Sequence, residues 1–153
     1  MKTSIDQLQK IISEYSERLS QISEVNFSHK PSPEKWSRKE EIGHLIDSAH
    51  TNMRRFMVSQ YEENPKIVYD QNFWVEAGNF RFQSSSNLIV LWQSLNLQIS
   101  EVLKKMPEPF YSRNCDTGKE KIELHSLEWL AEDYVKHLKH HLHHILELEA
   151  IPY

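Results

Sequence analysis

Residues 133–149 of the chain read DYVKHLKHHLHHILELE and contain five of its nine histidines. Residues spaced three or four apart lie on one face of a helix, and such a stripe runs through this stretch and begins just before it. This stripe consists of Leu127, Leu130, Tyr134, His137, His141, Ile145 and Leu148. It predicts a helix from about Ser126 to Glu149 with one buried face, on which two histidines stand where apolar residues would be expected.

His137 and His141 are the informative pair, because they lie one turn apart and about 40° apart around the helix axis. Two imidazoles placed in this way can bind one metal ion. Alternatively, both are core or boundary residues with satisfied hydrogen bonds, and the spacing alone leaves the two interpretations open. His144 lies beside His137 on the helical wheel, whereas His140 and His143 turn progressively toward solvent.

Three further helices are predicted from apolar residues at helical spacing, over residues 4–22, 37–61 and 86–106. Ser4 with Gln7, and Ser37 with Glu40, fit the capping-box pattern at the start of the first two. Pro107 ends the third, because proline cannot continue a helix.

Two long irregular segments, 62–85 and 107–125, separate these helices, and we expect no helix longer than about three turns in either. The chain has only three glycines, which argues against a sheet-rich fold with many tight turns. We therefore predict an all-α fold, a four-helix bundle of antiparallel type with long crossover loops, as one domain over residues 1–153.

The composition argues against several classes of function. The formal net charge of −4, with 26% charged residues, offers nothing that attracts nucleic acid. No apolar run approaches the roughly 20 residues of a membrane span, and the first residues lack the apolar block of a signal peptide. We expect a cytoplasmic protein in which the one cysteine, Cys115, is reduced and packs as an ordinary residue. A small molecule is the expected partner, and the oligomeric state stays open, a homodimer included.

A metal site would need a third ligand besides the pair at His137 and His141. The remaining candidates are His29, His44, His50 and His125. The helical wheel does not decide between the two on the second helix. His44 falls on a polar stripe with Glu41, Ser48, Thr51 and Arg55, where it could be plain surface, and His50 flanks the apolar face.

Three motifs together resemble the DinB-like superfamily, most closely its YfiT-type branch, whose members are assigned as metal-dependent hydrolases and bacillithiol transferases. The motifs are KWSRKEEIGHLIDSAHTNMRRF at 35–56, VYDQNFW at 68–74 and DYVKHLKHHLHHI at 133–145. The resemblance implies a four-helix bundle in which His44, His137 and His141 bind a divalent metal ion. It gives His50 no ligand role, and it places His144 at a position that is not usually a ligand.

Three histidines leave an ion with open positions, as expected of a catalytic site, and imidazole suits zinc first and nickel second. The resemblance implies that the metal activates a low-molecular-weight thiol, such as bacillithiol, for transfer to an electrophile. A metal-dependent hydrolase and a non-catalytic, stress-associated metal-binding module are the alternatives.

No residue is assigned a catalytic role from the sequence. Asp47 is a candidate base or support for the site, although a solvated helix acid is the commoner case. Arg54 and Arg55 could hold a thiol's carboxylates. Three residues of the crossover could line the pocket, namely Tyr69, Asp70 and Trp74.

Overall fold

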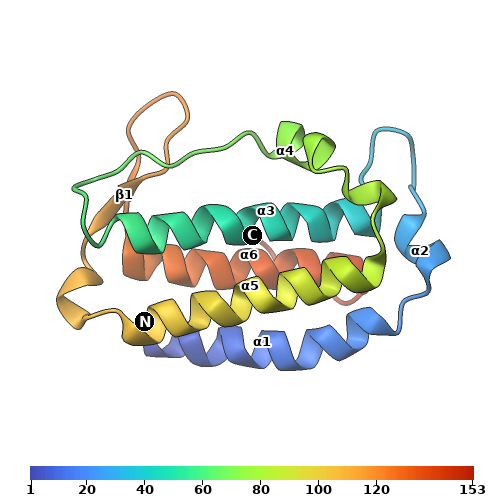
Figure 1. Ribbon diagram of the computed structural model, residues 1–153, viewed down its shortest axis with the longest axis horizontal. Helices are drawn as coiled ribbons and strands as arrows, with labels where there is room; N and C mark the ends of the chain where they lie inside the picture. Colours follow the sequence, from blue (N-terminus) through green and yellow to red (C-terminus); the bar gives the residue numbers. More distant parts are fainter.

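A computed structural model describes residues 1–153 and contains four long helices. They are α1 (Lys2–Ser20), α3 (Arg38–Val58), α5 (Ser85–Lys105) and α6 (Leu127–Ile145). Figure 1 shows them packed side by side along the longest axis of the molecule. The predicted all-α four-helix bundle is confirmed.

The segments between the long helices contain only short elements. These are α2 (Glu24–Ser28), α4 (Gln71–Ala77), η1 (Phe80–Phe82), η2 (Glu108–Phe110), β1 (Asn114–Asp116) and β2 (Leu124–Ser126). Both crossovers therefore lack a helix longer than three turns, as predicted. The small antiparallel hairpin of β1 and β2 was not predicted. Asp116 stabilises its turn, because Oδ1 accepts hydrogen bonds from the backbone N–H groups of Gly118 and Glu123.

The two predicted helix caps have different outcomes. Ser37 and Glu40 form the expected capping box at the start of α3. The box predicted for Ser4 and Gln7 is wrong, since α1 already begins at Lys2 and Ser4 is buried within it. The amino group of Met1 instead pairs with Glu128 Oε1 at 2.5 Å, which joins the beginnings of α1 and α6.

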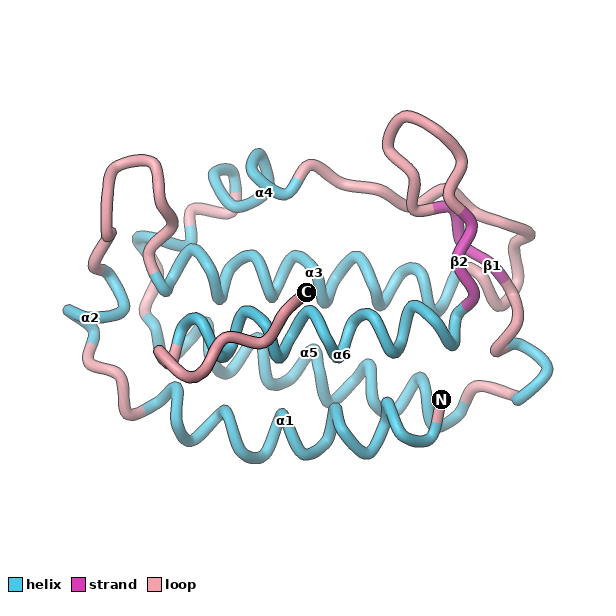
Figure 2. Tube along the Cα trace, turned by 180° about the vertical axis from the view of Figure 1, so that it is seen from behind, coloured by secondary structure: helices cyan, strands magenta, loops and turns pink.

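The bundle is not antiparallel throughout. Each of α1 and α3 packs against both α5 and α6, so α1 and α3 lie diagonally opposite each other. Figures 1 and 2 show that α3 and α5 run in the same direction, because residues 59–84 return along the whole bundle before α5 begins. The pairs α1 with α5 and α3 with α6 are antiparallel. This last pair places the start of α3 beside the end of α6.

The interior is one cluster of 30 buried apolar residues contributed by all four long helices. One polar bond crosses it: the Tyr134 hydroxyl on α6 donates to Asn96 Oδ1 on α5 at 2.7 Å. The crossover packs closely on α3 where Phe80 covers Gly43, since a Cβ at Gly43 would lie 2.1 Å from Phe80 Cδ2. These contacts fix how the crossover sits over the face of α3 that carries His44.

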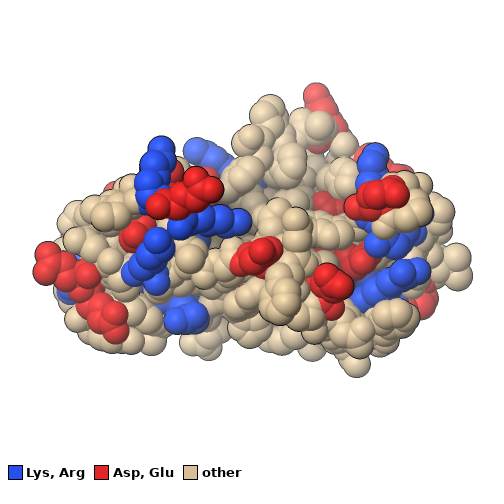
Figure 3. All heavy atoms as spheres, turned by 90° about the horizontal axis from the view of Figure 1, so that it is seen from above, with Lys and Arg blue, Asp and Glu red and all other residues tan.

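Helix hydropathy and surface charge are two further features of the molecule. None of the helices is both long and apolar enough to cross a lipid bilayer. On the face seen from above in Figure 3, basic and acidic side chains are intermixed rather than gathered into a patch of one sign.

Candidate metal centre

Three histidines from two antiparallel helices converge between α3 and α6. His44 lies on α3, and His137 and His141 lie one turn apart on α6. Their ring centroids are 4.6 to 5.0 Å apart, and one nitrogen from each lies within 4.8 Å of those of the other two. The structure thus brings together the three residues predicted from the sequence.

The polar stripe of α3 is buried, which decides between the alternatives that the helical wheel left open. Only 2% of His44 is exposed. Glu41, Ser48 and Thr51 are also buried, because this face of α3 lies against α6 and beneath the crossover. By contrast, His50 is exposed.

Burial keeps two of these imidazoles neutral at physiological pH. Burial, together with the smaller effect of the neighbouring His141, lowers the pKa of His44 to about 4 and that of His137 to about 2. A neutral imidazole carries a free lone pair, which is the form that binds metals.

Hydrogen bonds orient the two histidines of α6. Nδ1 of His141 donates to Glu41 Oε1 at 2.8 Å, and Nδ1 of His137 lies 3.4 Å from Ser48 Oγ. Both Nε2 atoms are therefore free to face the centre. Partners of this kind fix the tautomer and the ring orientation of a metal-binding histidine. Glu41 is buried and also accepts from Nδ1 of His144 at 2.8 Å.

The geometry and chemistry of the three donors fit a divalent ion. Nε2 of His44 and Nε2 of His137 are 3.0 Å apart, and the edge of a tetrahedral zinc site with bonds of about 2.05 Å measures about 3.3 Å. Small movements would therefore suffice to admit an ion. Nδ1 of His44 is buried without any partner. Three imidazoles without thiolates suit zinc, nickel and copper in particular.

The other clustered histidines do not point at this centre. His144 is the most exposed of the cluster, with 75% of its side chain accessible, and it reaches the centre only through Glu41. His140 and His143 are partly buried, so the expectation that both turn to solvent is only approximately right. Their Nδ1 atoms bond the carbonyls of Ile151 and Glu149, which belong to the segment following α6.

Three side chains that the sequence suggested for the site have environments that differ from those expected. Asp47 is only 6% exposed and its Oδ2 has no hydrogen-bond partner, so it is not a solvated helix acid. Burial raises its pKa to about 7. Arg54 is exposed. Arg55 is engaged by the backbone, since Nη2 donates to the Ile67 carbonyl at 3.0 Å.

The three crossover residues suggested for the pocket each make a defined contact. Asp70 caps α4 by accepting from the N–H groups of Asn72 and Phe73. Tyr69 and Trp74 pack on each other with ring centroids 5.2 Å apart. Cys115 is fully buried beside the Pro65 carbonyl, in agreement with its prediction as a packing residue.

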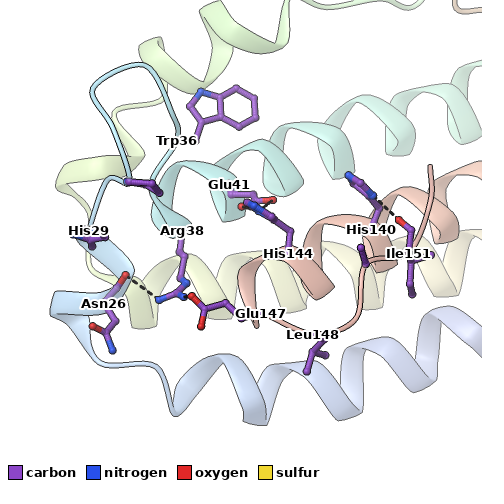
Figure 4. A pocket seen from close by; sticks show the side chains of 12 residues that line it. Asn26, His29, Trp36, Arg38, Glu41, His140, His144, Glu147, Leu148 and Ile151 are labelled. Carbon is purple, nitrogen blue, oxygen red and sulfur yellow. Dashed lines mark hydrogen bonds and ion pairs between the residues drawn. The ribbon is translucent and has the colours of Figure 1, made fainter.

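A groove of about 710 Å³ lies near the three histidines, although none of the three is among the residues that line it. Its walls come from α2 and the following loop, the start of α3, the end of α6 and residues 147–151 (Figure 4). Glu41 and Trp36 belong both to this groove and to the surroundings of the centre, since the Trp36 ring lies 5.2 Å from that of His44. The sequence interpretation missed both residues as parts of the site. Glu41 could have been found, because it precedes His44 by one turn on the same stripe.

The chain's last residue also reaches the centre. Segment 146–153 folds back along α6 (Figure 2), and the Tyr153 ring lies 5.3 Å from that of His137. The Tyr153 hydroxyl donates to Asp133 Oδ2 at 3.0 Å. The sequence offered no periodic signal for this contact.

A four-helix bundle with a histidine triad between two of its helices is the class of protein that these observations define. The model of the DinB superfamily matches residues 7–145. The chain therefore belongs to the DinB superfamily.

Comparison with individual proteins supports this membership. The chain is 31% identical over 114 residues to YfiT of Bacillus subtilis, a protein assigned as a metal-dependent hydrolase. That match covers 74% of this chain and 64% of YfiT, so the chain spans less than two thirds of its relative.

Two solved structures share the fold. The first is that of YfiT, which is described as a probable metal-dependent hydrolase with an unusual four-helix bundle topology. It matches with a TM-score of 0.86 at 24% identity, over 95% of this chain and 83% of the YfiT chain. The mycothiol-dependent maleylpyruvate isomerase matches with a TM-score of 0.72 at 17% identity, over 98% of this chain and 61% of its own.

Proposed function

We propose that the protein binds a divalent metal ion through His44, His137 and His141 and uses it to transfer a low-molecular-weight thiol, such as bacillithiol, to an electrophilic substrate. The observation that carries the proposal is the convergence of three imidazoles from α3 and α6, near a groove whose lining residues Trp36 and Glu41 contact them. A site that served stability alone would need no such opening, which argues against a non-catalytic metal-binding module. Zinc is the first candidate for the metal and nickel the second.

When bound, such an ion lowers the pKa of a thiol that joins it, so that thiolate is present at neutral pH. The chain's own residues hold and orient the site. Glu41 and Ser48 fix the ring orientations of His141 and His137. Trp36 packs against His44 and excludes water from one side of the site.

The reaction needs a group that takes the thiol proton. Asp47 is the buried carboxyl one turn after His44, its Oδ2 lacks a partner, and its pKa is raised to about 7 by burial, close to the value that suits a general base. The sulfur then forms a bond to the electrophilic carbon while the bond to the leaving group breaks, and the leaving group departs with that electron pair.

A metal-dependent hydrolase is the second candidate, favoured by the assignment of YfiT. The same three imidazoles would support either reaction, with water in place of the thiol. The mycothiol dependence of the isomerase that shares this fold favours the thiol.

Metal analysis of purified variants tests the site. Replacing His44, His137 or His141 by alanine should sharply reduce occupancy, because each loss removes one of three protein donors. His50→Ala is the matched control, since His50 is exposed on the same helix as His44. His140→Ala and His143→Ala should leave occupancy nearly unchanged. Equal losses from all five clustered histidines would instead indicate a flexible surface chelator.

Activity assays with a panel of thiols and electrophiles test the reaction. We expect conjugation that depends on both metal and thiol. Ester or amide hydrolysis that requires metal and no thiol, without conjugation across the panel, would favour the hydrolase.

A further inference from the structure

The groove beside the triad has one strong cationic group. Arg38 is the only lysine or arginine among its lining residues, and it lies on the first turn of α3. Figure 4 shows its side chain directed toward the end of α6. The guanidinium pairs with the carboxylate of Glu147, and its Nη1 lies 3.5 Å from the Asn26 carbonyl. Arg38 thus already holds a carboxylate in the groove.

Glu147 is a displaceable partner for this guanidinium. Its side chain is 77% exposed, so it can remain hydrated after leaving Arg38. Its backbone has a φ of 54°, in the left-handed region, and this conformation costs a non-glycine residue free energy. A guanidinium binds carboxylates through two parallel hydrogen bonds, which a ligand could supply in place of Glu147.

The position of Arg38 limits the size of such a ligand. Arg38, Glu41 and His44 follow one another at intervals of three residues along α3. Six residues of helix correspond to about 9 Å along its axis. The side chains of Arg38 and His44 also leave the helix about 120° apart, so a ligand bound at both ends would have to span at least about 10 Å. Trp36 contacts His44 and also lines the groove, so it links the groove to the triad.

We propose that Arg38 is the anion subsite of this groove, and that it binds a carboxylate of a peptide-sized thiol whose sulfur reaches the triad. Glu147 occupies the subsite in the free protein and competes with the ligand. The inference rests on the proposed function, because it assumes that the thiol is the group bound at the metal.

The test compares glutathione with its diethyl ester, which has the same thiol and nearly the same length without the carboxylate charges. Titration calorimetry of the protein loaded with Co²⁺ measures the affinity of each. The near-ultraviolet charge-transfer band of a cobalt thiolate reports separately whether sulfur reaches the metal. We expect glutathione to bind about tenfold more tightly than the ester, as a charge-assisted hydrogen bond would give.

Variants test which residues cause the preference for glutathione over its ester. Arg38→Ala should abolish it while leaving cobalt binding and the thiolate band of the ester intact. Arg38→Lys should retain part of it, because lysine keeps the charge without the two-pronged geometry. Glu147→Gln should tighten glutathione binding severalfold by removing the competing carboxylate. Arg54→Ala is the control, since Arg54 is exposed and lies outside the groove.

Equal affinities for glutathione and its ester, or a preference that survives in Arg38→Ala, would overturn the subsite. A failure of the proposed function has a different signature. In that case neither thiol produces the thiolate band, although calorimetry can still detect the dependence of glutathione binding on Arg38.

Discussion

Glu41 is the side chain on which the orientation of the proposed metal site most depends. Its buried carboxylate accepts hydrogen bonds from two histidines, and only His141 is a proposed ligand. A carboxylate behind a metal-binding imidazole holds the ring in place and makes its other nitrogen a better donor. His144, the second partner, helps in turn to hold Glu41.

Replacing Glu41 by glutamine should weaken metal binding by about ten- to hundredfold, because the neutral amide is a poorer acceptor. The measurement is competition with a chromophoric chelator. His144→Ala should have a smaller effect, and Glu132→Gln, at an exposed position on α6, should have none. An unchanged affinity in Glu41→Gln would show that the carboxylate does not support the site.

Asp47 should make the stability of the metal-free protein depend on pH. Burial raises its pKa to about 7 from the ordinary value of 3.8, so between these values the folded state holds a proton that the unfolded state has released. Stability from this group is full below pH 4 and is lost as pH rises toward 7. At about 1.4 kcal/mol per pKa unit, the loss is on the order of 4 kcal/mol.

Asp47→Asn should remove this loss. Thermal unfolding of both proteins without metal should show the variant gaining on the wild type from pH 4 to pH 7, with a constant difference above about pH 8. A difference independent of pH would mean that Asp47 ionises as freely in the folded state as in the unfolded chain.

At this scale the sequence predicted part of the site. His137 and His141 followed from spacing, because both occupy positions of a strong apolar stripe. His44 could be selected only through the family resemblance. Hydrophobic periodicity reveals the apolar face of a helix, whereas α3 also buries a second face that is polar and carries His44. Glu41 was missed for the same reason, and Asp47 was named only as a candidate because an acid on that stripe is more often solvated.

The arrangement of elements depends on contacts that no single helix reveals. The four long helices were predictable because each carries a continuous apolar stripe. The parallel direction of α3 and α5 was not, since it depends on the path of residues 59–84 over the bundle. The hairpin of β1 and β2 was missed because its strands have three residues each, too few for a periodic pattern.

Gly43→Ala should destabilise the protein through the crossover. The new methyl group would fall within 2.1 Å of the Phe80 ring, so α3 and η1 must separate. Overpacking of this kind costs about 1–3 kcal/mol, which outweighs the better helix propensity of alanine. Denaturant unfolding measures the loss. Adding Phe80→Ala should cost less in the Gly43→Ala background than in the wild type, and strictly additive effects would contradict the proposed contact.

The bond between Tyr134 and Asn96 should contribute to stability across the diagonal of the bundle. Tyr134→Phe leaves the Oδ1 of a fully buried asparagine without its donor, which costs about 1–3 kcal/mol. Combining it with Asn96→Leu should recover part of this loss, because no unpaired acceptor would then remain. Denaturant unfolding of the two single variants and the double variant measures the coupling.

For the molecule as a whole, the proposed metal site connects parts of the chain that are far apart in sequence. His44 belongs to α3, and the other two ligands lie more than ninety residues later on α6. An ion bound by all three would favour the folded state, because the unfolded chain does not hold the three imidazoles together. Metal binding should therefore raise the stability of the entire bundle and not only order the site.

Adding zinc to the metal-free protein should raise the melting temperature. At a free concentration one hundred times the dissociation constant, one site stabilises by about 2.7 kcal/mol, which for a domain of this size corresponds to about 5–10 °C. A chelator should reverse the shift, and nickel should reproduce it in proportion to its own affinity. His137→Ala should lose most of the shift and His50→Ala should keep it. A shift of equal size in His137→Ala would place the stabilising ion elsewhere on the molecule, because a site that has lost one of three ligands cannot retain its full preference for the folded state.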